Sequence, residues 1–437
     1  KNLETQISKK RSEYQKVTKK IMEMTQTKTK FLIKNERILE EEVKKAELSL
    51  DFAHTQKSFI ATGFVPTTKV SKVKEQLTST TKGAIVFEEP ELAKKEAVPV
   101  KLNNKEPIQS FEALVKLYEL PKANEADPSF LIFLTFPLFF GIMLGDIGYG
   151  LITLFLFMWI KKKWPVTKQF MHIFMIASIF TILFGGVFGE VLGYEHVSVE
   201  TGEKLCNVGI CLHKEVIESH GHEYVVYDFP RLLNRVHGTM KIGDFEILSI
   251  LAIGIMIGFV HINLGLLIGF FNMWKAHGFM HAFLEKLSWY IMQAGVFITI
   301  LTLTKTLPLR VWVGPIIFGV SCVLLYLGEG PKGIIEIPAI FSNMLSYVRL
   351  GAVGLASVGL AVVVNENLAK PFIELGGFYL IPAILVMIIG HTVNIGLGVL
   401  GPFLHGIRLH YVEYFSKFFT GGGKPFKPFG LETIGGR

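Results

Sequence analysis

Apolar and polar positions repeat with a helical period over about the first 55 residues. Apolar side chains recur every three or four positions from Leu3 to Ile38, in a segment otherwise rich in Lys and Glu. Such a stripe predicts a long helix that pairs with another helix in a coiled coil. Because no helix start signal accompanies Lys1, we expect this segment to be one arm of an antiparallel pair whose other arm lies upstream.

The residues that follow mix short patterns of both kinds. An apolar run over residues 59–65 ends at Pro66, an amphipathic stretch covers 70–77, and residues 84–87 have the composition of a strand. These patterns predict a small α/β knob. A linker rich in Pro and charge comes next, with one short amphipathic helix expected near residues 111–120.

Long apolar blocks dominate the chain from Phe130 onward. They cover residues 130–160, 168–193, 247–274, 283–304, 308–328, 334–364 and 377–406. Since one crossing of a bilayer needs about 20 residues, these blocks are long enough to span a membrane. We therefore expect a coiled-coil arm segment at residues 1–57, the knob and linker at 58–127, and a transmembrane domain at 128–437.

The first apolar block predicts two helices that meet in a tight bend, because its middle contains Gly145, Asp146 and Gly148. The basic residues 161–163 follow it, and the positive-inside rule places them in the cytoplasm with the N-terminal arm. Both ends of the block then lie on one side. This gives about eight transmembrane helices, with the loop of residues 194–246 outside and both termini in the cytoplasm.

The composition indicates a membrane protein that crosses the lipid bilayer several times. Half of the 437 residues are hydrophobic, and the net charge of +8 is spread over the arm and the short loops. That distribution fits membrane anchoring and excludes a nucleic-acid-binding patch.

The loop of residues 194–246 contains the candidates for covalent or metal chemistry. Cys206 and Cys211 share it with three histidines, His213, His220 and His222. A local disulfide or a metal clip is one interpretation, and unpaired loop residues are the other. Because spacing alone is weak support, we predict no metal site, and whether the two cysteines form a disulfide stays open.

Two arginines interrupt apolar stretches: Arg349 lies inside the block 334–364, and Arg408 lies just past the block 377–406. A guanidinium stays charged in proteins and costs roughly 2.5 to 3.5 kcal/mol at the centre of a membrane helix, so both are expected to serve a function. Ser346 lies on the same helical face as Arg349. Small residues beyond it would let another helix approach closely, and they include Gly351, Gly354 and Ser357.

A polar stripe in the last block ends at Arg408. Its members recur at spacings of three and four: His391, Asn394, Gly398, Gly401 and His405. They could line a wet crevice for ions or pair with other helices to hold the bundle together, and we favour the ion path. Glu336 is a further candidate for the crevice wall, with Glu190, His261, Asn263, Gln293 and Asn343 behind it.

Two other carboxylates have different expected roles. Asp146 belongs to the bend of the first block rather than to the ion path. Glu413 follows Arg408 by five residues, about one and a half α-helical turns, so their pairing is expected to be marginal.

Several motifs resemble those of the subunit a / subunit I family of V-type and archaeal A-type ATPases, most closely the archaeal subunit I. They lie at residues 62–66, 136–150, 188–190, 346–350 and 405–413. The resemblance implies an all-α polytopic membrane protein with about eight transmembrane helices, two of them long and tilted at the C-terminus. It also implies a cytoplasmic coiled-coil arm and a location in the cell membrane if the source is archaeal or bacterial.

The resemblance implies a stator of a rotary ATP synthase. Arg349 stands where the family has its essential arginine, facing the rotor-ring carboxylate between two aqueous half-channels for protons or sodium ions, and Arg408 matches the second arginine. Relatives with a carboxylate ten residues before that arginine differ from this chain, which has Gly398 there.

The same resemblance implies the partners. They are the c- or K-type subunit of the rotor ring, the E-type and H/G-type subunits of the peripheral stalks, and the C/d-type subunit that caps the central stalk.

No phosphate-binding Gly-x-x-x-x-Gly-Lys-Ser/Thr loop occurs, so we expect no catalytic site and no cofactor in this chain. The alternative is a stand-alone secondary transporter or channel, which would show inverted repeats in two halves; none is evident. The sequence leaves open which ion is carried and in which direction the motor turns.

Overall fold

The computed structural model describes residues 2–48, 52–89, 98–194, 196–197, 213–219, 222–228, 231–236, 238–242, 245–305 and 307–428. The chain divides into two compact units, residues 1–99 with 425–437 and residues 100–424.

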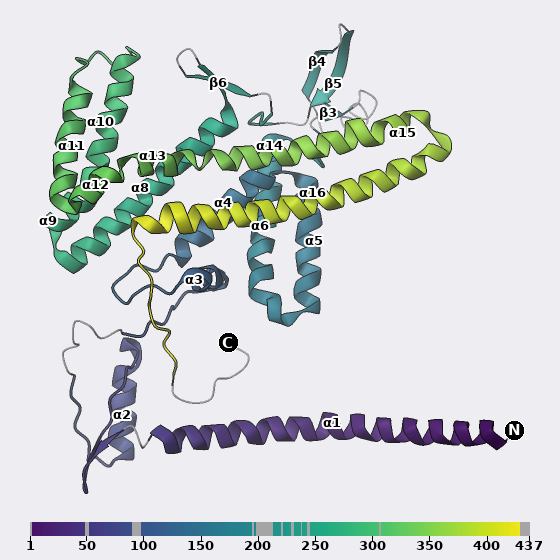
Figure 1. Ribbon diagram of the computed structural model, residues 1–437, viewed down its shortest axis with the longest axis vertical. Helices are drawn as coiled ribbons and strands as arrows, with labels where there is room; N and C mark the ends of the chain where they lie inside the picture. The colour runs from purple at the N-terminus through teal and green to yellow at the C-terminus, as the bar shows by residue number, and fades with distance from the viewer. Residues whose placement is uncertain are drawn as a thin grey trace. The chain divides into compact units, whose positions relative to one another are not determined.

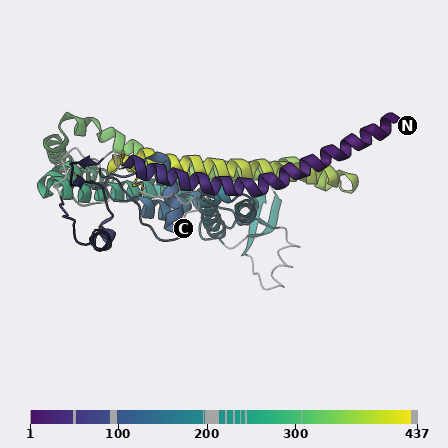
Figure 2. The same ribbon diagram turned by 90° about the horizontal axis from the view of Figure 1, so that it is seen from below.

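The first unit begins with one continuous helix, α1 (Asn2–Leu48), visible in both orientations (Figures 1 and 2). The predicted helix is confirmed. Its apolar stripe is exposed at Ile7, Tyr14, Val17, Ile21, Met24, Phe31 and Ile38.

Within the described residues 52–89, the chain forms one hairpin and one helix. Strands β1 (Ala53–His54) and β2 (Phe59–Ile60) pair antiparallel, and a 3-10 turn (Thr67–Lys69) leads into α2 (Val70–Thr80). The predicted strand at residues 84–87 is wrong, because this segment is irregular and Val86 is exposed. A strand forms only where it can hydrogen-bond to a neighbouring strand. Here β2 pairs with β1 and not with residues 84–87.

The second unit starts with a short helical segment. A 3-10 turn (Ile108–Phe111) and α3 (Glu112–Tyr118) form where a short helix was predicted. Phe111, Leu114 and Val115 are buried, and the ring of Phe111 meets that of Phe133 edge to face at 5.3 Å. The end of the linker therefore packs onto the first apolar block.

The first apolar block splits into two helices, as predicted. Helices α4 (Ser129–Leu144) and α5 (Ile147–Lys163) meet at Gly145, whose φ of +23° suits glycine, and at Asp146, which caps α5 by accepting a hydrogen bond from the Tyr149 N–H at 2.9 Å. A 3-10 turn (Pro165–Thr167) then leads to α6 (Lys168–Phe188), which runs beside α5 (Figure 1).

The described parts of the loop that follows form two small sheets. Strands β3 (His196–Val197), β4 (His213–Ser219) and β5 (His222–Asp228) form an antiparallel sheet in the order β3-β5-β4, and β6 (Thr239–Ile242) pairs with β7 (Phe245–Leu248). Cys206, Cys211 and His220 lie outside the described residues.

The next helices form a second group. Helix α8 (Ser249–His277) is followed by α9 (Phe279–Ala282), a π-helical turn (Phe283–Leu287), α10 (Ser288–Leu303) and α11 (Val313–Glu329).

Two long helical runs end the unit. The first comprises α12 (Pro331–Ile335), α13 (Ile337–Leu345), α14 (Val348–Val362), a π-helical segment (Val363–Ala369) and α15 (Lys370–Leu375). The second comprises a 3-10 turn (Gly377–Tyr379), α16 (Leu380–Arg408), a π-helical segment (Leu409–Tyr414) and a 3-10 turn (Phe415–Lys417). In Figure 1 α14 and α16 run side by side and across the direction of α5, α6, α10 and α11.

The described part of the chain holds five helices long and apolar enough to cross a membrane: Pro165–Phe188, Ser249–His277, Phe279–Leu303, Pro331–Leu375 and Gly377–Lys417. Ser129–Leu144 and Val313–Glu329 are shorter apolar helices. The structure is mostly helical, and the count of about eight crossings stays a prediction.

Helix α4 links the two hydrophobic cores of this unit. Phe136 and Phe140 belong to the core shared with α3 and α6, and Phe139 and Met143 belong to the core shared with α8 and α14. Helix α4 therefore packs, together with α8, against α14, which contains Arg349.

Candidate functional site

Arg349 lies in the first turn of α14, immediately after a break in the helical run. Tyr347 lies in the break between α13 and α14. It is fully buried, and its hydroxyl lies 2.6 Å from Nδ1 of His261 on α8. Leu350, on the other side of Arg349, is also fully buried. These two anchors leave the Arg349 side chain 21 % exposed at the edge of the bundle.

Glu413 lies beside both arginines. Its Oε1 is 3.9 Å from Nη1 of Arg349 and 4.0 Å from Nε of Arg408, and its side chain is only 2 % exposed. Arg408 is 58 % exposed. From the sequence, the pairing of Glu413 with Arg408 was expected to be marginal. The structure brings the two side chains within ion-pair distance.

The backbone explains this proximity. In an α-helix, residues five apart point in directions about 140° apart. After Arg408, however, residues Leu409–Tyr414 are π-helical, and the wider i→i+5 turn brings residues five apart back toward one face. Glu413 is thereby turned toward Arg408.

A buried polar cluster lies away from the two arginines, after Arg349 on α14 and before Arg408 on α16. The Tyr149 hydroxyl is 2.7 Å from Nδ1 of His391 and accepts a hydrogen bond from Nδ2 of Asn394 at 2.9 Å. Asn394 also donates to the backbone carbonyl of Ser357 at 3.0 Å, and Nε2 of His391 lies 3.0 Å from Oδ1 of Asn365. The structure therefore brings His391, Asn394 and Ser357 together.

Sequence reasoning missed Tyr149 and Asn365 in this cluster. Tyr149 belongs to the Gly-rich bend, and Asn365 belongs to a π-helical segment that no pattern marked. Asn365 falls one residue beyond the apolar block 334–364, so the rule that polar groups inside such blocks are functional did not select it.

The other predicted wall residues lie apart from this cluster. Glu336 joins α12 to α13 and is paired with Lys332 at 3.4 Å, with 43 % of its side chain exposed. Ser346 donates a hydrogen bond to the Ser342 carbonyl at 3.0 Å, and His405 is half-buried on α16. Behind them, Nδ2 of Asn263 donates to Oε1 of Gln293 at 2.9 Å.

The small residues of α14 divide into two faces. Gly351 is buried against Ile250 and Leu251 of α8, and Gly354 is buried against the α4 backbone at Ile142 and Met143. These two glycines therefore serve packing within the chain. The exposed small residues of α14 are instead Ala352, Ala356 and Gly359.

A second buried ion pair joins the 194–246 loop to the helices. Arg235 and Glu190 are both almost fully buried, and Nε of Arg235 donates to Oε1 of Glu190 at 3.1 Å, with a second contact from Nη2 to Oε2. The guanidinium also lies 4.8 Å from the ring centre of Phe188. Glu190 was predicted to lie behind the crevice, whereas Arg235 was missed because it lies in a polar loop.

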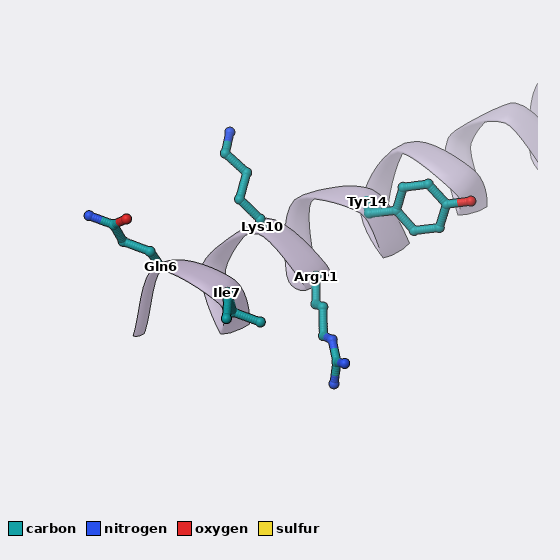
Figure 3. A pocket seen from close by; sticks show the side chains of 5 residues that line it. All are labelled: Gln6, Ile7, Lys10, Arg11 and Tyr14. Carbon is teal, nitrogen blue, oxygen red and sulfur yellow. The ribbon is translucent and has the colours of Figure 1, made fainter. Parts of the chain in front are cut away.

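The described residues offer little to a metal or small ligand. They contain no group of three or more His, Cys, Asp or Glu side chains that could hold a metal ion. Figure 3 shows an open hollow on α1, lined by Gln6, Ile7, Lys10, Arg11 and Tyr14. Because it lies along one exposed helix, it does not bear on the chemistry around Arg349.

Comparison with known proteins gives a consistent result. A profile described as the V-type ATPase 116kDa subunit family matches residues 1–194 and 337–431. The A-type ATP synthase subunit I of Archaeoglobus fulgidus is 30% identical over 91% of this chain and 62% of its own length, and that of Methanocaldococcus jannaschii is 30% identical over 98% and 63%. The V-type ATP synthase subunit I of Chlamydia trachomatis is 26% identical over 90% and 65%. The chain spans less than two thirds of the length of these relatives.

Proposed function

The chain belongs to the V-type ATPase 116kDa subunit family, and from that premise we propose that it is a membrane stator subunit of an A/V-type ATP synthase. In this proposal the chain catalyses no reaction itself. It forms half-channels for protons or sodium ions against a rotor ring, and Arg349 faces the ring carboxylate.

The observation that carries the proposal is the placement of Arg349. Its cation is fixed in a membrane-length helical run, partly exposed, beside the exposed small residues of α14. A positive charge at such a surface favours the deprotonated form of a carboxylate that passes it. The ion would therefore leave the ring site at Arg349, and the guanidinium would block direct leakage between the half-channels.

The polar groups on either side of Arg349 are candidates for the two half-channels. Glu336 and Ser346 precede it in the helical run, while Ser357, eight residues beyond it, meets Asn394 and through it Tyr149 and His391. Eight residues of helix correspond to about 12 Å. Asn365, which contacts His391 of the second group, donates from Nδ2 to the Leu192 carbonyl at 2.9 Å, and Leu192 lies in the segment that leads from α6 into the 194–246 loop.

The arm supplies the proposed attachment to the rest of the motor. Helix α1 exposes its apolar stripe, which suits pairing with another helix and, through the completed coiled coil, with peripheral-stalk subunits. The rotor ring and the cap of the central stalk are the other proposed partners.

Replacing Arg349 tests this function. In the assembled complex reconstituted into vesicles, Arg349→Ala should abolish ATP-driven ion pumping, and Arg349→Lys should impair it, because an ammonium lacks the planar fork of a guanidinium. Arg310→Ala is the matched control, since Arg310 is exposed and lies between α10 and α11. Full pumping by the Arg349→Ala complex would refute the proposal.

A further inference from the structure

The two intramembrane arginines share one buried anion. Glu413 is enclosed by protein, whereas Arg349 and Arg408 reach the edge of the bundle. The three groups together carry a net charge of +1 when Glu413 is ionised.

Neither contact between Glu413 and the arginines is a hydrogen bond. Both distances exceed the usual N–H···O range of about 2.7 to 3.2 Å. Within the described part of the chain, Nη1 of Arg349 and Oε2 of Glu413 have no hydrogen-bond partner. A bidentate pair would hold the guanidinium in one orientation. Here Nη1 of Arg349 is buried and faces Glu413 without such a pair, and the exposed 21 % of the side chain can meet another carboxylate.

Glu413 itself is held in place by its neighbours on the π-helical segment. Leu409 and Tyr414 are fully buried, and Tyr414 stacks on His261 with a centroid distance of 3.9 Å. Nδ1 of His410 lies 2.7 Å from the Gly406 carbonyl. The anion is therefore fixed by the fold.

We propose that Glu413 is a positioning residue, an internal counter-ion that weakens the hold of Arg349 on the carboxylate it faces. The inference rests on the proposed function of Arg349. With Glu413 ionised, the ring site meets a smaller positive potential, so the coupling ion can rebind there at moderate concentration. Other charged or titratable groups that interact with Glu413 or the arginines are Tyr347 before α14, His405 on α16 and Lys417 after it, and Tyr414 interacts in turn with Tyr347.

The test measures how pumping depends on the concentration of the coupling ion. In the reconstituted complex, Glu413→Gln raises the net charge of the group from +1 to +2. The half-saturating concentration of protons or sodium ions should rise about tenfold, or about one pH unit for protons, because a more positive site binds cations less well. Glu413→Asp, which keeps the charge, should stay within about twofold of the unchanged complex.

Glu374→Gln serves as the control, because Glu374 is an exposed carboxylate on α15. It should leave the half-saturating concentration unchanged. A Gln variant that pumps more slowly with the same half-saturating concentration would overturn the inference, since that is the result of a purely structural role. If the Glu413→Gln complex does not assemble, the Glu413→Asp complex decides. Assembly of the Asp variant with a normal half-saturating ion concentration supports the role of Glu413 as a counter-ion. If neither variant assembles, the inference is refuted. Loss of pumping in Arg349→Ala, measured alongside, separates these outcomes from failure of the proposed function.

Discussion

Breaking the buried pair between Glu190 and Arg235 should destabilise the protein severely. Both side chains are within 1 % of complete burial, and two nitrogens of Arg235 contact the two oxygens of Glu190. Removing one partner leaves an uncompensated charge in a medium of low dielectric constant, which typically costs about 3 to 5 kcal/mol. Glu190→Gln keeps the shape and removes the charge, so we expect a loss of that size in the free energy of unfolding.

The measurement is the unfolding of the purified chain in mixed detergent micelles at neutral pH. Glu366→Gln is the matched control, because the pair of Glu366 with Lys370 at 2.6 Å is about half exposed on both sides. An exposed pair contributes roughly 0 to 1 kcal/mol. Replacing both partners of the buried pair by apolar residues, Glu190→Leu with Arg235→Met, should cost less than Glu190→Gln alone. If Glu190→Gln were no more destabilising than Glu366→Gln, the assignment of a buried, dehydrated ion pair would be wrong.

Two further predictions concern stability in the same assay. Tyr149→Phe removes the hydroxyl that bonds to His391 and Asn394, and leaving those groups unsatisfied should cost about 1 to 3 kcal/mol, whereas Tyr326→Phe, at an exposed position, should be nearly neutral. Gly354→Ala would place a methyl group 3.0 Å from Nη1 of the buried Arg235 and 3.2 Å from the Met143 carbonyl oxygen of α4, so it should cost about 1 to 3 kcal/mol. The same change at Gly359, which faces open space, should be neutral or stabilise α14 by up to about 1 kcal/mol. Equal effects at the two glycines would contradict the close packing of α14 on α4 and Arg235.

The sequence predicted features that depend on neighbouring residues. The bend at Gly145 and Asp146 follows from small residues and a capping carboxylate within a few positions, and α1 follows from its repeating stripe. Residues 84–87 misled the prediction, because a strand-like composition does not supply a pairing partner.

The candidate site was predictable only in part. Arg349 and Arg408 were recognisable because a charge in an apolar block is costly wherever the chain folds. Tyr149 and His391 meet across more than 240 positions of sequence, and Arg235 reaches Glu190 from a polar loop. Such pairings depend on how helices and loops pack, which periodicity does not report.

The position of Glu413 shows why backbone irregularity matters to the electrostatics of this site. At about 4 Å, opposite charges near a protein surface attract by about 4 kcal/mol before the cost of dehydration. Arg408 is more than half exposed, so water screens its share, whereas the contact of Glu413 with the less exposed Arg349 is screened less. A regular α-helix after Arg408 would turn Glu413 away and leave two guanidinium groups without this anion. The π-helical segment Leu409–Tyr414 therefore decides how much positive charge Arg349 presents to any carboxylate that approaches it.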